Sequence, residues 1–179
     1  MSGAGETPEP GGKSESVSAV RDAAIGAEAK TVAGAALSID TFAYLAAETG
    51  LYEIQAAEIA LTRSGRDDVK AFARRMITDH KDIAGKLGSF LGGMERPNAP
   101  PQALDKLQQT LIDDLKGASD ADFDHRYIEQ QKAAHVTAVT LFKSYAAHGT
   151  DEGLRNLAVL GLPVLEQHLE MARKLAGSG

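Results

Sequence analysis

One titratable side chain stands on the apolar face of each of four predicted long helices in this 179-residue sequence. The four residues are Glu53, His80, His135 and His168. A buried carboxylate without a partner is costly, and so is a cluster of buried imidazoles that shares neither a proton nor a metal ion. One divalent cation removes both costs. Three nitrogen ligands and one oxygen ligand suit Zn, Fe, Mn or Cu, so we expect these residues to hold one divalent transition-metal ion.

The positions of these residues along their helices predict that they meet. Apolar residues recur every three or four positions and predict long helices over 40–64, 67–92, 120–148 and 151–176. Their midpoints fall near residues 52, 80, 134 and 164. In an antiparallel bundle such midpoints share one layer. Three of the four titratable residues lie within one residue of a midpoint, and His168 lies about one turn beyond its own, so the four should converge at mid-height.

Neighbours three or four positions from a candidate ligand, or one further turn along the same helix face, are candidates to support it. They are Thr49, Met76, Tyr127 and Gln131. A thioether beside an imidazole would admit copper, although methionine more often fills a core. Asp79 directly precedes His80 and should point about 100° away from it. We therefore expect the Asp79 carboxylate to be solvated.

A bridged two-metal centre is not expected from the spacing. Di-iron carboxylate bundles carry Glu-x-x-His on two helices, whereas Ile77 and Lys132 stand three residues before His80 and His135. The sequence therefore favours a single metal ion. It contains no nucleophile elbow and no convincing Ser/His/Asp arrangement, so no catalytic residue is assigned.

The elements that must position these residues are helical. Alanine and leucine, which favour helices, greatly outnumber valine and isoleucine, and tryptophan is absent. The predicted helix N-caps are Asp40, Asp67, Ser119 and Thr150. The predicted fold class is all-α, a ferritin-like antiparallel four-helix bundle with a short extra helix over 102–116 between the second and third long helices. That short helix is either the long crossover of the bundle or a lid.

Three regions are expected along the chain. Residues 1–16 are rich in Gly, Pro, Ser and Glu and predict a disordered leader. Residues 17–38 predict an Ala-rich N-terminal helical extension, and residues 39–177 predict the four-helix bundle. Because the apolar face of the extension consists of small residues, we expect it to dock loosely or to mediate a homo-oligomer.

The composition argues against a nucleic-acid partner, cysteine chemistry and a membrane span. The formal net charge of −6 and the pI of about 5.4 argue against a nucleic-acid partner. The absence of cysteine excludes disulfides, thiolate metal sites and cysteine nucleophiles. The most apolar run, 31–47, contains Asp40 and is shorter than the ~20 residues of a membrane span, so no transmembrane segment is expected.

Three motifs resemble those of one bacterial family. The run Phe72-Ala73-Arg74-Arg75-Met76-Ile77-Thr78-Asp79-His80 resembles its signature fA-x-x-Mi-x-DH. The other two are Phe123-Asp124-His125-Arg126-Tyr127 followed by His135, and Leu162-Pro163 followed by His168. The family is the ferritin-like domain of unknown function found in many exported or predicted outer-membrane proteins. The resemblance covers about residues 40–176.

The resemblance implies a ferritin-like bundle and a periplasmic or exported protein. Because residues 1–16 lack the layout of a signal peptide, a cytoplasmic location remains the other expectation. The family's motif positions would fall on Glu53, His80, Asp124, Tyr127, His135 and His168. The resemblance supplies no activity, and a shared fold does not transfer iron storage.

Three functions follow from these observations. The leading prediction is a metal-binding protein in metal handling or oxidative-stress defence. The second is a non-catalytic structural or interaction bundle, in which the buried Glu/His layer only sets the register of the helices. The third is a metal-dependent oxidoreductase that acts on peroxide or oxygen.

Overall fold

The computed structural model describes residues 37–94 and 101–178, and within them the chain forms five helices and no strand. The helices are α2 (Ile39–Arg63), α3 (Asp67–Gly92), α4 (Lys106–Gly117), α5 (Asp120–His148) and α6 (Glu152–Gly177). The predicted all-α fold class, with four long helices and a short one between the second and third, is confirmed. The predicted leader and residues 17–36 of the predicted extension lie outside the described residues.

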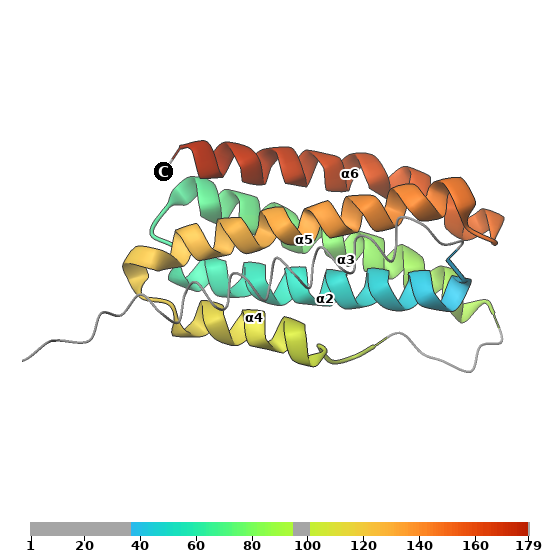
Figure 1. The fold of residues 1–179 in the computed structure, drawn as a ribbon, viewed down its shortest axis with the longest axis horizontal. Helices are drawn as coiled ribbons and strands as arrows, with labels where there is room; N and C mark the ends of the chain where they lie inside the picture. The colour runs from blue at the N-terminus through green and yellow to red at the C-terminus, as the bar shows by residue number, and fades with distance from the viewer. Residues whose placement is uncertain (1–36, 95–100, 179) are drawn as a thin grey trace, which may run out of the picture.

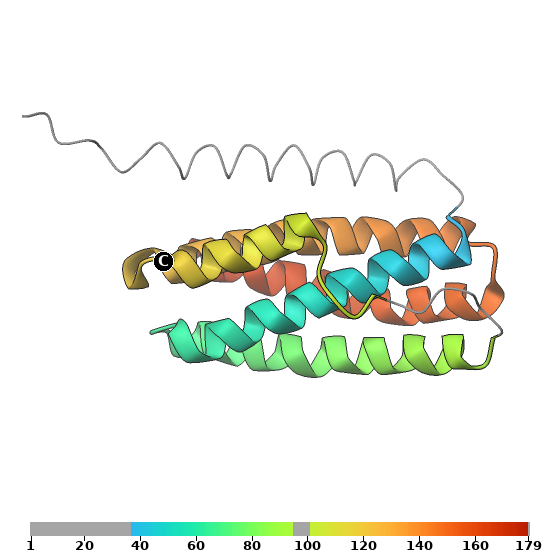
Figure 2. The same cartoon turned by 90° about the horizontal axis from the view of Figure 1, so that it is seen from below.

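The four long helices pack as two antiparallel pairs, α2 with α3 and α5 with α6 (Figure 1). The second pair lies against the first through contacts of α2 with α5 and of α3 with α6. Helices α3 and α5 run in the same direction, so the chain must return along the bundle between them (Figures 1 and 2). Each of these four pairs of long helices is therefore antiparallel, which brings the four helix midpoints into one layer.

The short helix α4 belongs to this return path. It begins beside the middle of the bundle and runs to the end at which α5 starts (Figure 1), and it packs against α2 and α5. The Arg63 guanidinium at the end of α2 donates to the carbonyl oxygens of Leu115, Lys116 and Ala118. These contacts satisfy carbonyls that the end of a helix leaves unpaired, and they fix where α5 begins.

Short polar side chains start four of the helices by accepting a hydrogen bond from a backbone N–H three residues on. These N-caps are Ser38, Asp105, Ser119 and Asp151. The prediction for Ser119 is confirmed, but those for Asp40 and Thr150 are wrong because neighbouring residues hold the N-cap position. The prediction for Asp67 is also wrong, because Asp67 is the first residue of α3 and the N-cap residue Arg66 makes no side-chain cap.

The apolar core has two halves. One contains Tyr52, Phe72, Met76, Ile112, Phe123 and Tyr127 among its buried residues. The other contains Phe42, Leu87, Leu141, Tyr145, Leu154 and Leu165. Glu53, His80, His135 and His168, called the polar layer below, lie at the boundary between the halves and are buried.

Among the helices of residues 37–94 and 101–178, none is both long enough and apolar enough to cross a membrane.

Candidate metal centre

Each long helix contributes one side chain to the polar layer. Glu53, His135 and His168 have no exposed surface, and His80 is 3% exposed. The Oε2 atom of Glu53 lies 3.3 Å from the Nε2 atom of His80 and 3.3 Å from the Nε2 atom of His135. The structure therefore brings together residues that are up to 82 positions apart in the sequence.

The three histidines form a compact group. Each offers one ring nitrogen, and the three nitrogens lie within 4.8 Å of one another. Their ring centroids are 5.3 to 5.6 Å apart. Metal–imidazole bonds are about 2 Å long, so nitrogens that share one ion lie at most about 4 Å apart, and these three rings would close slightly around a bound ion.

The outer nitrogens of two histidines are held by acceptors. His135 Nδ1 lies 2.8 Å from the backbone oxygen of Gln131, and since a carbonyl only accepts, Nδ1 donates and Nε2 keeps its lone pair. His168 Nε2 lies 2.8 Å from Oδ2 of Asp79. An ionised carboxylate also only accepts, so Nδ1 of His168 keeps its lone pair. In both histidines one ring nitrogen donates a hydrogen bond and the other keeps a free lone pair. This is the usual arrangement of a histidine that binds a metal ion.

Asp79 differs from its prediction. Its side chain is 25% exposed rather than fully solvated, and besides His168 it contacts Nε of Arg75 at 3.1 Å. The expected 100° rotation from His80 is a property of α3 alone. Helix α6 packs against α3. This packing places His168 within hydrogen-bond distance of the Asp79 side chain. Sequence spacing within one helix carries no signal for this contact.

The predicted supporting residues lie close to the polar layer. Met76 and Gln131 are fully buried, and Thr49 lines a pocket beside His80. Tyr127 is also fully buried, and burial together with the negative charge of Glu53 raises the pKa of its phenol. Asp124, one of the motif positions, stands three turns before His135 near the start of α5.

Burial sets the protonation of the polar layer. Burial raises the pKa of Glu53 well above its usual range. Burial, followed by repulsion from the other imidazoles, lowers the pKa of His80 well below its usual range. The same causes lower the pKa of His135 to about 3, and burial lowers that of His168 against the opposing pull of Asp79. The histidines are therefore neutral at pH 7, which is the form that binds metal ions.

Five buried atoms of the polar layer have no hydrogen-bond partner within the described residues. They are both carboxylate oxygens of Glu53, Nε2 of His80, Nε2 of His135 and Nδ1 of His168. The hydroxyl of Tyr127 and both side-chain polar atoms of Gln131 are buried and unpaired as well, whereas the Gln130 amide accepts from Tyr52 at 2.8 Å and donates to the backbone of Leu111 at 3.2 Å. Unpaired acceptors facing one another in a dry core fit a cation.

Comparisons with known proteins agree on the fold. No curated protein matches the sequence. Among solved structures, the chain is similar to CopM in its Cu(II)-bound form, with a TM-score of 0.69 and 16% sequence identity over 80% of this chain and 99% of that chain. At this identity the likeness shows a common helical bundle.

The sequence also matches one family over most of its length. The match spans residues 25–175, so it includes all five helices down to the last turn of α6 and every residue of the polar layer. The chain therefore belongs to the family described as "Domain of unknown function (DUF4142)".

Proposed function

We propose that this protein binds one divalent transition-metal ion in its polar layer. The single observation that carries the proposal is the set of five buried, unpartnered acceptor atoms contributed by four helices. The ligands would be Nε2 of His80 and His135, Nδ1 of His168 and the carboxylate of Glu53. This donor set of three imidazoles and one carboxylate suits Zn, Cu, Fe or Mn.

Charge supports the same conclusion. Burial raises the pKa of Glu53 in the metal-free layer, because an isolated buried carboxylate is strongly disfavoured. A dication supplies the opposite charge at the point that the carboxylate faces, and it uses the lone pairs that the neutral histidines leave free. Metal binding thus replaces unpaired polar atoms with coordinate bonds.

Copper is the first metal to test. The structural neighbour CopM is in a Cu(II)-bound form, and nitrogen and oxygen sites generally bind Cu(II) most tightly among first-row divalent metals. The biological role we propose is metal handling, with a contribution to oxidative-stress defence. We further propose an exported protein, as the resemblance of its motifs to exported families implies, and self-association through the extension over 17–38.

The test is a titration of chelator-stripped protein with Cu(II), Zn(II), Fe(II) and Mn(II), each followed by desalting and elemental analysis. We expect about one metal ion per chain in the wild type and none in His135→Ala. The matched control is His125→Ala, because His125 is exposed on the same helix and its loss should leave the stoichiometry unchanged. A folded wild type that retains none of the four metals would overturn the proposal.

The second candidate is a structural layer that only sets helix register. It is favoured by the pKa directions of Glu53 and the histidines, which allow an uncharged layer without any ion. Replacement of all four residues by apolar ones should then preserve folding and partner binding. The third candidate, an oxidoreductase, requires that the bound metal turn over peroxide or oxygen, which an assay of the loaded protein decides.

A further inference from the structure

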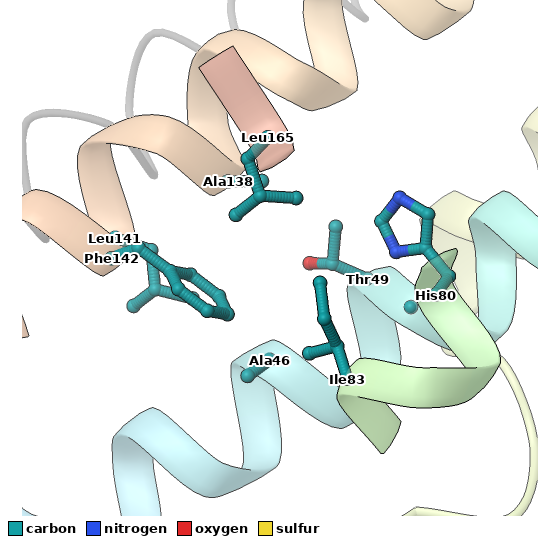
Figure 3. A pocket seen from close by; sticks show the side chains of 9 residues that line it. Ala46, Thr49, His80, Ile83, Ala138, Leu141, Phe142 and Leu165 are labelled. Carbon is teal, nitrogen blue, oxygen red and sulfur yellow. The ribbon is translucent and has the colours of Figure 1, made fainter. Parts of the chain in front are cut away.

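A small pocket lies beside His80, on the side of its ring that faces away from Glu53. It is lined by Ala46, Thr49, Gly50, His80, Ile83, Ala138, Leu141, Phe142 and Leu165. Its walls come from α2, α3, α5 and α6 (Figure 3). The space accommodates about one water molecule, and all but two of the lining side chains are apolar or absent.

The two ring nitrogens of His80 face different parts of the bundle. Nε2 lies 3.3 Å from Glu53 and faces the centre of the polar layer. Nδ1 faces α2, since a β-carbon built on Gly50 would lie 3.9 Å from it. Figure 3 shows this nitrogen turned toward Thr49 and the pocket. A metal ion at Nε2 therefore leaves Nδ1 carrying a proton that must be donated into the pocket.

His80 differs in this respect from the other two histidines. Gln131 accepts a hydrogen bond from His135, and Asp79 accepts one from His168. Among the hydrogen bonds of residues 37–94 and 101–178, none involves Nδ1 of His80, and this nitrogen, unlike Nε2, is not one of the fully buried unpaired atoms. Histidines that bind a metal almost always donate their other N–H to a carboxylate, a carbonyl or a water molecule, and here only a water molecule is left.

The Thr49 hydroxyl is the second polar group of the pocket. Five other helical threonines donate to a backbone carbonyl of the preceding turn, namely Thr62, Thr78, Thr110, Thr137 and Thr140. The hydroxyl of Thr49 makes no such bond in the part of the chain that the structure describes, and it points into the pocket (Figure 3). A hydroxyl and an imidazole N–H facing the same small space provide the two partners that a buried water molecule requires.

We propose that this pocket binds one water molecule, which accepts a hydrogen bond from Nδ1 of His80 and is held by the hydroxyl of Thr49. The water molecule orients the His80 ring so that the lone pair of Nε2 faces the metal site, as Gln131 and Asp79 do for the other two histidines. Thr49 is then a positioning residue that acts through the water molecule. The part of this inference that concerns metal affinity rests on the proposed function.

The experiment compares wild type with Thr49→Val and Thr49→Ser. Valine has nearly the shape of threonine but removes the hydroxyl, whereas serine keeps it. Crystal structures of the metal-free proteins at about 1.5 Å resolution or better should reveal the water molecule in wild type and Thr49→Ser, and an empty pocket in Thr49→Val. Chelator competition should then give a metal affinity about 10–100-fold lower for Thr49→Val, and restored to within about threefold of wild type for Thr49→Ser.

The two readouts separate the possible failures. An empty pocket in the wild-type crystal structure overturns the inference, whatever the metal does. Equal metal affinity of wild type and Thr49→Val overturns the positioning role of Thr49. A wild type that binds no metal overturns the proposed function, while density for the water molecule, lost in Thr49→Val, would still establish the water site.

Discussion

Asp79 on α3 and His168 on α6 are joined by a hydrogen bond of 2.8 Å between Oδ2 and Nε2, across 89 positions of sequence. The same carboxylate oxygen contacts Arg75, whose Nη2 atom donates to Gln167 at 2.7 Å. A fully buried imidazole is thus tied to a half-buried pair of charged groups. This arrangement fixes which nitrogen of His168 carries the proton and which faces the polar layer.

The first prediction concerns this pair. Asp79→Ala should lower metal affinity about 10–100-fold, because His168 loses the acceptor that fixes its tautomer and ring orientation. Asp79→Asn should have an intermediate effect, since an amide oxygen still accepts but carries no charge. The measurement is competition against a chelator of known affinity. Asp82→Ala is the control, because Asp82 is exposed on the same helix and pairs only with Lys86 in the described structure. Equal affinities for Asp79→Ala and Asp82→Ala would contradict the prediction.

The second prediction is that a bound metal stabilises the fold. A ligand at 100 times its dissociation constant adds about 2.7 kcal/mol to the free energy of unfolding. For a domain of this size, roughly 2–4 °C of Tm corresponds to each kcal/mol, so Tm should rise by roughly 5–10 °C. Differential scanning calorimetry of stripped and loaded protein measures the shift. His135→Ala should show no shift, and a metal-induced rise in that variant equal to the wild-type rise would place the stabilising site elsewhere.

Much of the fold follows from the sequence. Periodic apolar residues set the four long helices to within a residue or two of their observed ends. Four groups near the helix midpoints must meet once every packed pair of long helices is antiparallel, and the structure brings them together. The predicted start of the short helix at residue 102 is wrong, because Asp105 caps the helix and Lys106 begins it.

The details around the ligands do not follow from the sequence. The contact between Asp79 and His168 depends on how closely α3 and α6 pack, which the spacing within either helix does not encode. The pocket beside His80 depends on small side chains such as Ala46 and Ala138 facing one another from different helices. Helical periodicity predicts which face of a helix is buried, but the partner of each buried group is set by packing between helices.

The third prediction is the pH dependence of the metal-free fold. The histidines have lowered pKa values in the folded state, so the unfolded chain takes up protons first as pH falls. The contribution of the histidines to stability is therefore complete above about pH 6.5, the pKa of unfolded histidine. It is lost progressively as pH falls toward 3, by up to about 1.4 kcal/mol per pH unit for each histidine. Urea unfolding between pH 4 and 7 measures this slope. It should be smaller in His135→Leu than in wild type, and equal slopes would contradict the assignment.

Glu53 provides the last prediction, because its two proposed roles respond oppositely to one substitution. Burial raises its pKa in the folded state, so folding retains a proton that the unfolded chain releases above about pH 4.5. The metal-free fold should therefore lose stability as pH rises above that value, until the pH exceeds the pKa in the folded state. Glu53→Gln keeps the shape without the titration, and it should make the metal-free protein more stable than wild type at pH 8.

The same variant should bind metal more weakly, because an amide is a poorer ligand than a carboxylate and leaves the charge of the dication uncompensated. Unfolding at pH 8 and chelator competition on the same samples measure both effects. If the polar layer only set helix register, Glu53→Gln would change the stability of the protein but not its metal affinity. Wild type and Glu53→Gln would then bind any metal ion equally. Higher stability of the metal-free protein together with lower metal affinity is expected only if Glu53 is a metal ligand that destabilises the metal-free fold.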